Sequence, residues 1–489
     1  VARGADHVVV EHGSWVETGE SFFAEGAWNG PFGEPSLGDA DIVLGSGGTL
    51  VAENVAFTPT THTMERLYSH ESPTAVLVAN SLPFLLEACQ AKLDLRNWSY
   101  ERQLMTFLRG YKKAVKRLEL AGGATVQLHY HDTLLIGPDL RQRVKHPPAP
   151  PRFACYGAYV DYLTRSLGTL HRNASSPQRA VAYTPLSTIS SGYDSPACAV
   201  LAKRLGCRRT VTFSHAREDF NERPLKTLDD SGEHIAKMLE LDVTTFSRNA
   251  YLAADDYPEA LFIATGSGGD DVVMSVLRET LEGTMLFTGM LGDTLWSTHD
   301  TQSPELSEQY RFLYPAGGSL QEFRLQTGFV HVPVPLLTFT RHADLRRISN
   351  SLEMRQWRVG GHYDRPIPRR LVEDEGVPRR AYAREKRAIS QPFWLQKSDA
   401  SCMSARSLRD LEAFRRRAAA RYAFGELRMR INESWQRAAA NWRKRVARLA
   451  RDPYHSDAYL DAGVADPLRF HWAVEKVAAA YRGSELRTL

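Results

Sequence analysis

The spacing of apolar and polar residues differs between segments of this chain, and these differences suggest where its parts begin and end. In residues 1–150, DIVL at 41–44 is a short β-rich run, and ATVQLHYH at 124–131 alternates apolar and polar positions. This period of two predicts β-strands, and the glycines at 45–48 predict a turn after the first run. Residues 99–120 instead carry apolar side chains at helical spacing and predict a helix. We therefore expect a mixed α+β domain over residues 1–150.

A proline-rich segment separates this first part from the next. Four prolines fall within residues 147–151, which prevents a helix or a central strand and predicts a linker. Beyond it, short β-branched runs such as VTF at 211–213 alternate with helical patterns such as residues 232–241. This alternation predicts an α/β domain over residues 151–400, with a mostly parallel sheet covered by helices on both faces.

The last part, residues 401–489, predicts a helical extension that packs on the α/β domain. It is rich in Ala and Arg up to residue 451, with RRR at 415–417 and RKR at 443–445. A solvated helix face is the favoured interpretation of these arginines, and a nucleic-acid grip stays open as the alternative.

Composition narrows the class of protein. Of 489 residues, 43% are hydrophobic and 24% charged, which is typical of a soluble globular protein and excludes disorder as the main state. A net charge of +4 on a chain of this length produces only a weak electrostatic potential, so it gives no reason to expect nucleic acid as a partner. No apolar run is long enough for a membrane span or a signal peptide. Five scattered cysteines without a CxxC spacing argue against a disulfide framework and a zinc knuckle. We expect a cytoplasmic location.

The most informative segment is YTPLSTISSGYDSPAC at residues 183–198. It predicts a strand, a turn of small hydroxyl residues and then a helix that has Pro196 in its first turn. Backbone N–H groups at such a helix N-terminus can bind a phosphate or pyrophosphate. Asp194 would repel that anion unless a cation lay between them, which suggests Mg²⁺. An ordinary turn with serine caps is the alternative.

The sequence SSGYDS at residues 190–195 resembles the SGGxDS pyrophosphate loop of the PP-loop ATP pyrophosphatases. Five segments after this loop resemble the asparagine synthetase-like branch, which includes β-lactam synthetase. They are TFS at 212–214 where adenine would lie, the helix at 231–241, FTGMLGDTLW at 287–296 (second loop, SGxGxDELF), NSLEMRQW at 350–357 (LExRxPF) and REKRAIS at 384–390 (late lysine motif). The resemblance implies a PP-loop fold for residues 151–400.

The resemblance also implies ATP and Mg²⁺ as cofactors and assigns roles to single residues. The residues that would bind ATP or pyrophosphate are Ser190, Ser191, Gly192, Tyr193, Asp194, Ser195, Phe213, Ser214, Thr288 and Gly289. Asp194 and Asp293 would hold Mg²⁺. Lys386 would neutralise charge as the α-phosphate is attacked, and Glu353 would orient or deprotonate a nucleophile. The alternatives are a surface lysine for Lys386 and an ion pair of Glu353 with an arginine such as Arg355.

The chain also departs from the pattern of this family. Met290, Leu291 and Thr294 replace the polar, glycine and acidic positions of the second loop, which puts the asparagine-type amidation step in doubt. Glutamine-dependent members begin with a nucleophilic Cys, whereas this chain begins with Val1 and has its first cysteine at Cys89. Residues 1–150 are therefore either a degenerate glutaminase-like domain or an unrelated one.

The resemblance, with these departures, implies an ATP-dependent, AMP-forming ligase that joins a small-molecule or peptide carboxylate to an amine whose source is not a glutaminase of its own. A homodimer stays open, and neither a membrane nor nucleic acid is expected as a partner. The alternatives are the same adenylation used for epimerisation, cyclisation or sulfur transfer, an inactive ATP-binding protein, and an RNA-modifying enzyme.

Overall fold

The structure of the chain is a computed structural model that describes most of its residues. The residues that it leaves undescribed are 5–6, 34–36, 110, 112–113, 219–226, 300–316, 362, 383–386, 392, 394–398, 421–437, 439–441, 443–465, 484–486 and 489.

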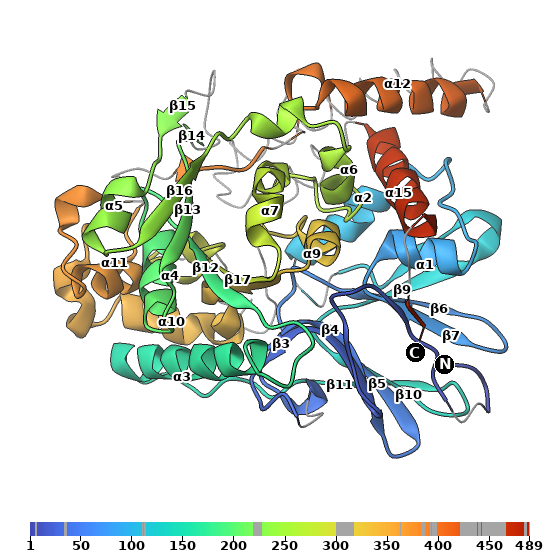
Figure 1. Cartoon of the computed structure of the whole chain (residues 1–489), viewed down its shortest axis with the longest axis horizontal. Coiled ribbons are helices and arrows are strands. Elements are labelled where there is room, and N and C mark those ends of the chain that lie inside the picture. The colour runs from blue at the N-terminus through green and yellow to red at the C-terminus, as the bar shows by residue number, and fades with distance from the viewer. Residues whose placement is uncertain are drawn as a thin grey trace.

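Two antiparallel sheets make up the first part of the chain (Figure 1). The six-stranded sheet has the order β11 (Gln142–Lys145), β10 (Thr133–Ile136), β5 (Asn54–Thr58), β4 (Val43–Val51), β3 (Phe22–Trp28), β2 (Glu17–Thr18). The four-stranded sheet has the order β7 (Val76–Ala79), β6 (Leu67–Glu71), β9 (Thr125–His129), β8 (Arg117–Glu119). Two short helices, α1 (Leu82–Ala88) and α2 (Tyr100–Leu104), lie between strands β7 and β8 in the sequence.

The predicted turn at residues 45–48 is wrong, because β4 continues through all these glycines and pairs with β3. Gly45 has a φ of +102°, and a Cβ there would lie 2.3 Å from the carbonyl oxygen of Glu25. A Cβ on Gly47 would lie 2.4 Å from the carbonyl oxygen of Phe23. The glycines therefore allow a close approach of two strands rather than a reversal of the chain.

The predicted helix at residues 99–120 is also largely wrong. Helix α2 ends at Leu104, a 3₁₀ segment follows (Met105–Arg109), and Arg117–Glu119 form the edge strand β8. Leu118 is fully buried in that strand and lies opposite Val126 of β9. Apolar spacing alone did not reveal this pairing, because the partner strand supplies the backbone hydrogen bonds that a helix would have made.

A five-stranded, wholly parallel sheet forms the middle of the chain, and it confirms the α/β prediction for this part. Its order is β16 (Asp242–Phe246), β13 (Arg209–Phe213), β12 (Thr184–Thr188), β17 (Thr284–Thr288), β18 (Val330–Pro333). In order of sequence these strands are third, second, first, fourth and fifth. Every residue of β17 is buried, as expected for a central parallel strand.

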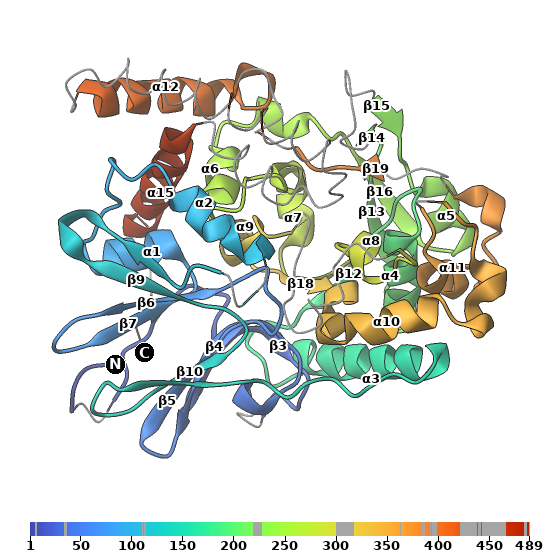
Figure 2. The ribbon, with the colours of Figure 1, turned by 180° about the vertical axis from the view of Figure 1, so that it is seen from behind.

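Helices connect and cover this sheet (Figures 1 and 2). They are α3 (Tyr156–Ala174), α4 (Asp194–Lys203), α5 (Glu233–Met238), α6 (Pro258–Ile263), α7 (Arg278–Leu281), α8 (Gly292–Leu295), α9 (Gln321–Thr327), α10 (His342–Ser349) and α11 (Pro366–Glu373). Helix α4 packs on β12 and β17, and α11 packs on α4. Helix α3 packs on β3, so it lies along the boundary between the parallel sheet and the antiparallel sheets. Three short strands, β14 (His215–Glu218), β15 (Thr227–Asp229) and β19 (Arg387–Ala388), form a small antiparallel sheet.

The C-terminal helices are α12 (Ala405–Ala420) and α15 (Pro467–Arg482). Helix α15 packs against α1 of the first part and against α6 of the middle part, while α12 packs against α15 and α6. The hydroxyl of Tyr481 donates a hydrogen bond to Glu322 over 3.0 Å. A final strand, β20 (Arg487–Thr488), pairs with β1 (Glu11–His12) near the start of the chain. The last helix therefore holds two parts of the molecule together.

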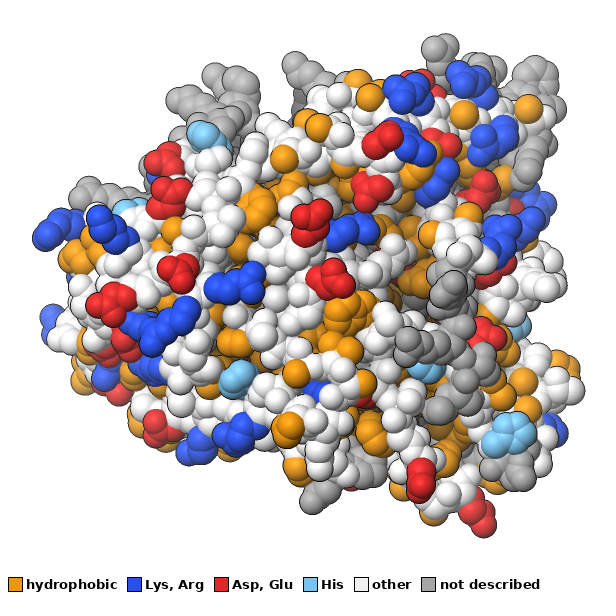
Figure 3. Space-filling view, in the orientation of Figure 1, with side chains coloured by type: hydrophobic (Ala, Val, Ile, Leu, Met, Phe, Trp, Pro, Cys, Tyr) orange, Lys and Arg blue, Asp and Glu red, His pale blue; other side chains and the backbone are white. Residues whose placement is uncertain are grey.

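Arginines of α12 pair with acidic side chains of the protein itself. Arg415 makes ion pairs with Asp399 and Asp466, and Arg417 lies 3.8 Å from Glu475. Figure 3 shows basic and acidic side chains interspersed over α12. This supports the solvated helix face over a nucleic-acid grip; the second arginine cluster, residues 443–445, lies outside the described residues. No helix in the described part of the chain is long and apolar enough to cross a membrane.

Glu101 of α2 gives a testable pH dependence. Burial raises the pKa of this carboxyl to about 7, while Arg469 opposes the rise and Asp466 adds to it. The native state therefore holds a proton that the unfolded state has lost, and stability falls as pH rises from about 4.5 to about 7. We expect Glu101→Gln to reduce this fall by on the order of 2–3 kcal/mol, measured by urea unfolding between pH 4.5 and 8.

The parent protein is the reference, because burial also raises the pKa of Glu322 to about 7 and contributes the same trend to both proteins. Glu53→Gln, at an exposed residue between β4 and β5, should leave the trend as it is. Identical pH profiles of Glu101→Gln and the parent would contradict the prediction.

Candidate functional site

The centre of the parallel sheet provides a natural place for a ligand. The strand order runs outward from β12 through β13 in one direction and from β17 through β18 in the other. The connections that follow β12 and β17 therefore leave toward opposite sides, and in open parallel sheets ligands bind outside the carboxyl ends of the strands at such a point. Two of the predicted loops follow these two strands.

The first loop leaves β12 at Thr188 and enters α4 at Asp194. The hydroxyl oxygens of Ser190 and Ser195 lie 2.8 Å apart, and the Gly192 N–H donates to the Ser190 hydroxyl over 3.2 Å. Ser195 lies in the first turn of α4, where unbonded N–H groups and the helix dipole favour an anion. The sequence prediction of a strand, a hydroxyl-rich turn and a helix is confirmed here.

The second loop lies directly against the first. A Cβ on Gly289 would stand 2.5 Å from the backbone carbon of Asp194 and 2.7 Å from the backbone nitrogen of Ser195. A Cβ on Gly292 would stand 2.7 Å from the carboxyl carbon of Asp194. These two glycines therefore let the β17–α8 loop approach the N-terminus of α4, and they bring Asp293 near Asp194.

A buried arginine binds the carboxylate of Asp194. Arg365, directly before α11, donates from Nη1 to Oδ2 of Asp194, and the two side chains are 5% and 11% exposed. Burial opposes the charge of this guanidinium, but the attraction of Asp194, then of Tyr363 and Asp293, raises its pKa above the ordinary value. Asp194 and Asp293 thus act on one shared cation, and in this structure that cation is Arg365.

The donor chemistry of this pair fits Mg²⁺. Carboxylate oxygens are the ligands that Mg²⁺ takes from proteins, usually one or two of them together with substrate phosphates. No cluster of three or more His, Cys, Asp or Glu side chains suited to a metal occurs among the described residues. Asp194 and Asp293 would therefore hold Mg²⁺ only as part of a ligand set that phosphate oxygens complete.

A second arginine reaches the first loop from β19. Arg387 donates from Nη1 to the Ser191 hydroxyl over 3.1 Å and to the backbone oxygen of Asp229. The Ser191 hydroxyl in turn donates to Asp230, and the Ser191 N–H donates to the Asp230 backbone oxygen over 3.1 Å. Ser191 stands where the resembled motif has a glycine. It is hydrogen-bonded both to Arg387 of β19 and to Asp230, which directly follows β15. The predicted Lys386 lies outside the described residues, next to Arg387.

Aromatic rings line the other side of the first loop. Tyr193 is buried between Tyr382, at a ring distance of 4.6 Å, and Tyr363, at 5.5 Å. The guanidinium of Arg365 lies 4.4 Å from the centre of the Tyr363 ring. The Tyr363 hydroxyl would be 2.9 Å from a Cβ on Gly192. The segment that carries Tyr363 and Arg365 therefore lies against the loop.

The remaining predicted nucleotide residues lie at the ends of neighbouring strands. Phe213 ends β13 and is buried, and the Ser214 N–H donates to the backbone oxygen of Phe246 over 3.0 Å. Thr288 ends β17, and its hydroxyl lies 2.8 Å from Nε2 of His331. The structure thus places these residues at the same edge of the sheet as the two loops.

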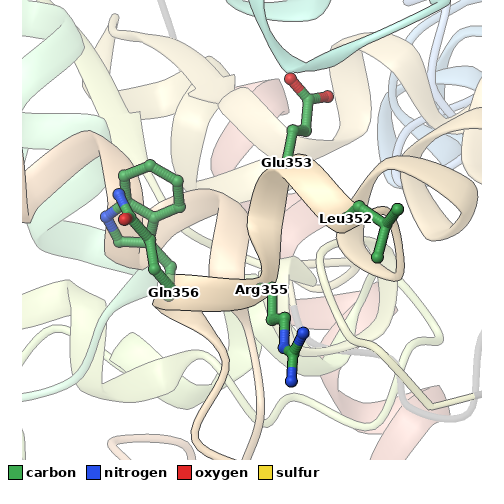
Figure 4. Close-up of a pocket in the computed structure, with 5 residues that line it drawn as sticks. Leu352, Glu353, Arg355 and Gln356 are labelled. Carbon is green, nitrogen blue, oxygen red and sulfur yellow. The ribbon is translucent and has the colours of Figure 1, made fainter.

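Glu353, which was predicted to orient or deprotonate a nucleophile, contacts a helix N-terminus and an arginine in the structure. It lies in a 3₁₀ segment (Leu352–Trp357) that lines a shallow pocket, and Figure 4 shows Glu353 and Arg355 pointing in different directions. One carboxylate oxygen accepts the backbone N–H of Tyr156 over 2.8 Å, and the other lies 3.9 Å from Arg370. Glu353 therefore caps the N-terminus of α3, and the pairing partner is Arg370 rather than Arg355. Its predicted catalytic role stays a prediction.

Sequence reasoning missed Arg365 and Arg387. Arg365 belongs to an Asp-Arg-Pro sequence directly before a helix, where the proline marks the first turn but gives no sign of a contact with residue 194. Arg387 lies inside the segment that resembles the late lysine motif, where the motif assigns the cation to Lys386. A second basic residue in this segment was the available signal for Arg387, whereas no motif points to Arg365.

No protein-family model matches the chain, and no curated protein matches it.

Proposed function

We propose that this protein is an ATP-dependent, AMP-forming ligase of the asparagine synthetase-like PP-loop family. It would adenylate a substrate carboxylate and transfer the acyl group to an amine that its own chain does not generate. The observation that supports this best is the contact of the 190–195 loop with the β17–α8 loop at the switch point of a parallel sheet. The fold and the order of the motifs both support a nucleotide site at this edge of the sheet.

The reaction requires binding and charge neutralisation above all. A carboxylate oxygen attacks the α-phosphorus of ATP, the bond from that phosphorus to the bridging oxygen breaks, and pyrophosphate leaves. The amine nitrogen then attacks the acyl carbon, AMP leaves and the nitrogen loses a proton. Ser190, Ser195 and the N-terminus of α4 would bind the pyrophosphate, and Arg387 adds positive charge beside them.

Asp194 and Asp293 would hold Mg²⁺, which supplies further neutralisation of phosphate charge when bound. Lys386 is proposed to act at the α-phosphate. Phe213 and Ser214 would contact the adenine at the end of β13. The five cysteines, all of which the structure describes, are thiols rather than disulfides, which agrees with the proposed reducing, cytoplasmic location.

Two alternatives have specific observations for or against them. Sulfur transfer is disfavoured, because burial raises the pKa of Cys207 to about 11 and that of Cys198 well above its ordinary value, with Asp194 adding to the rise at Cys198. An ATP-binding protein without turnover is favoured by Met290 and Thr294, which stand at the polar and acidic positions of the resembled second loop and leave Asp293, assigned to Mg²⁺, as the one acidic side chain of this loop.

The test is a product assay with Mg²⁺-ATP and a panel of amino acids and small peptides. We expect AMP and pyrophosphate in equal amounts with at least one carboxylate, and at least a 100-fold lower rate in Asp194→Asn, since metal and phosphate contacts are both lost (about 2.7 kcal/mol). Glu71→Gln, at an exposed strand end, is the matched control. ADP as the product would contradict the proposal, and ATP binding without turnover on the whole panel would favour the alternative of an inactive protein.

A further inference from the structure

The shared cation of Asp194 and Asp293 is a side chain of the protein itself. Arg365 donates to Asp194 in a pair that is almost wholly buried, and it lies in the field of Asp293. A buried guanidinium is stable only with close anionic partners, and a buried carboxylate likewise needs a cation. Arg365 and Asp194 therefore neutralise each other, and the negative charge of Asp293 further favours the charged guanidinium.

This arrangement opposes the binding of a free divalent cation. Mg²⁺ at Asp194 would have to displace Arg365 or lie beside its positive charge, and both are unfavourable in a buried site. The two carboxylates carry a total charge of −2, of which Arg365 already neutralises half. The protein alone thus offers a weak site for a metal.

A nucleotide changes this balance, because phosphate is a better partner for the guanidinium. Arginine binds phosphate through two parallel N–H bonds, and a triphosphate brings several negative charges at once. Arg365 contacts the N-terminal residue of α4, directly beside the predicted phosphate position. Binding a phosphate there would require the guanidinium to turn from Asp194 toward the N-terminus of α4 by rotation about its side-chain bonds.

We propose that Arg365 is a phosphate-binding residue that blocks the metal position until nucleotide arrives. This inference rests on the proposed function, since it takes the 190–195 loop as the phosphate site. When Arg365 turns to the phosphate, Asp194 and Asp293 become available to a divalent cation, and phosphate oxygens complete its ligand set. Nucleotide and metal then increase each other's affinity, as linkage requires.

The experiment measures Mn²⁺ binding to the full chain without nucleotide, by the electron paramagnetic resonance signal of free Mn²⁺. We expect the parent to bind weakly and Arg365→Gln, which keeps hydrogen-bond donors for Asp194 without the charge, to bind at least about tenfold more tightly. Arg365→Met should behave in the same way. The double variant Asp194→Asn with Arg365→Gln should lose this gain, which assigns the Mn²⁺ to these carboxylates.

A second measurement follows ATP binding in EDTA. The parent should bind ATP, and Arg365→Gln should bind it at least about tenfold more weakly, whereas Arg358→Gln, a half-exposed arginine beside Asp364, should bind like the parent. Thermal unfolding of each variant establishes that it is folded.

Three outcomes would overturn the inference. Tight Mn²⁺ binding by the parent without nucleotide is one, and it needs no variant to fold. The second is a folded Arg365→Gln whose Mn²⁺ and ATP affinities equal those of the parent; either result leaves the proposed ligase activity untouched. Absence of ATP binding by the parent, both in EDTA and with Mg²⁺, would overturn the inference and the proposed function together.

Discussion

Arg324→Met is expected to lower the free energy of unfolding by about 3–5 kcal/mol. Arg324 of α9 is 3% exposed and binds two carboxylates of the first part of the chain. Its Nε donates to Glu65 over 2.7 Å, and its Nη2 donates to Glu25 over 2.8 Å and to Glu65 over 2.7 Å. Methionine fills a similar volume but leaves two buried carboxylates without their cation. Such unpaired buried charges account for most of the loss of stability when one partner of a buried ion pair is removed. Urea unfolding followed by the fluorescence of the nine tryptophans measures the change.

Arg96→Met is the matched control. Arg96 is 72% exposed and pairs with Asp94 only two residues away, so its loss should change stability by less than about 1 kcal/mol. Because the two parts can unfold in separate steps, each transition is fitted on its own. Equal effects of the two substitutions would show that the Glu25–Arg324–Glu65 cluster does not hold the parts together.

Gly289→Val is expected to reduce the rate of AMP formation by about 100-fold or more. A side chain here meets the backbone of Asp194 and Ser195 rather than the end of a flexible side chain, so the two loops must separate. Separation of about 1 Å is enough, since misplacement of that size can reduce a rate by about 10²-fold. The assay is the same measurement of AMP and pyrophosphate that tests the proposed function.

Gly283→Val provides the comparison at the other end of β17. Gly283 has a φ of +65° and open space where a Cβ would point, so this change strains the backbone without touching the loops. We expect a modest loss of stability and a rate within about threefold of the parent. An equal loss of rate in both variants would mean that strand stability, and not the contact of the loops, controls the reaction.

Much of the fold could be predicted because its signals are local. The alternation of short strands and helices after residue 151 predicts a parallel sheet, and the hydroxyl-rich turn before Pro196 predicts a helix N-terminus. Both elements were confirmed. The incorrect predictions concern contacts between segments that are distant in the sequence. The glycines at 45–48 are typical of a turn, but they lie in a strand that pairs with β3. Leu118 has the spacing of a helical residue, but it lies in a strand that pairs with β9.

The candidate site shows the same limit. Asp194 was identified from its motif, whereas its partner Arg365 stands 171 positions later and has no motif of its own. The sequence therefore predicted that the carboxylate needs a cation, but not that the protein supplies one. Glu353 was identified in the same way, and the start of α3, which it caps, lies 197 positions before it.

The packing of α15 between α1 and α6 also has a consequence for synthesis. His471 of α15 contacts the backbone oxygen of Asn97 across 374 positions of the chain. At ribosomal rates of about 5–20 residues per second, roughly 20–75 s pass between the emergence of these two segments. During that time α1 lacks the helix that packs on it, including Tyr481, whose ring lies 5.2 Å from that of Phe84 in α1. The nascent chain is thus exposed to aggregation until α15 leaves the ribosome, and chaperone supply during expression should govern the yield of folded protein.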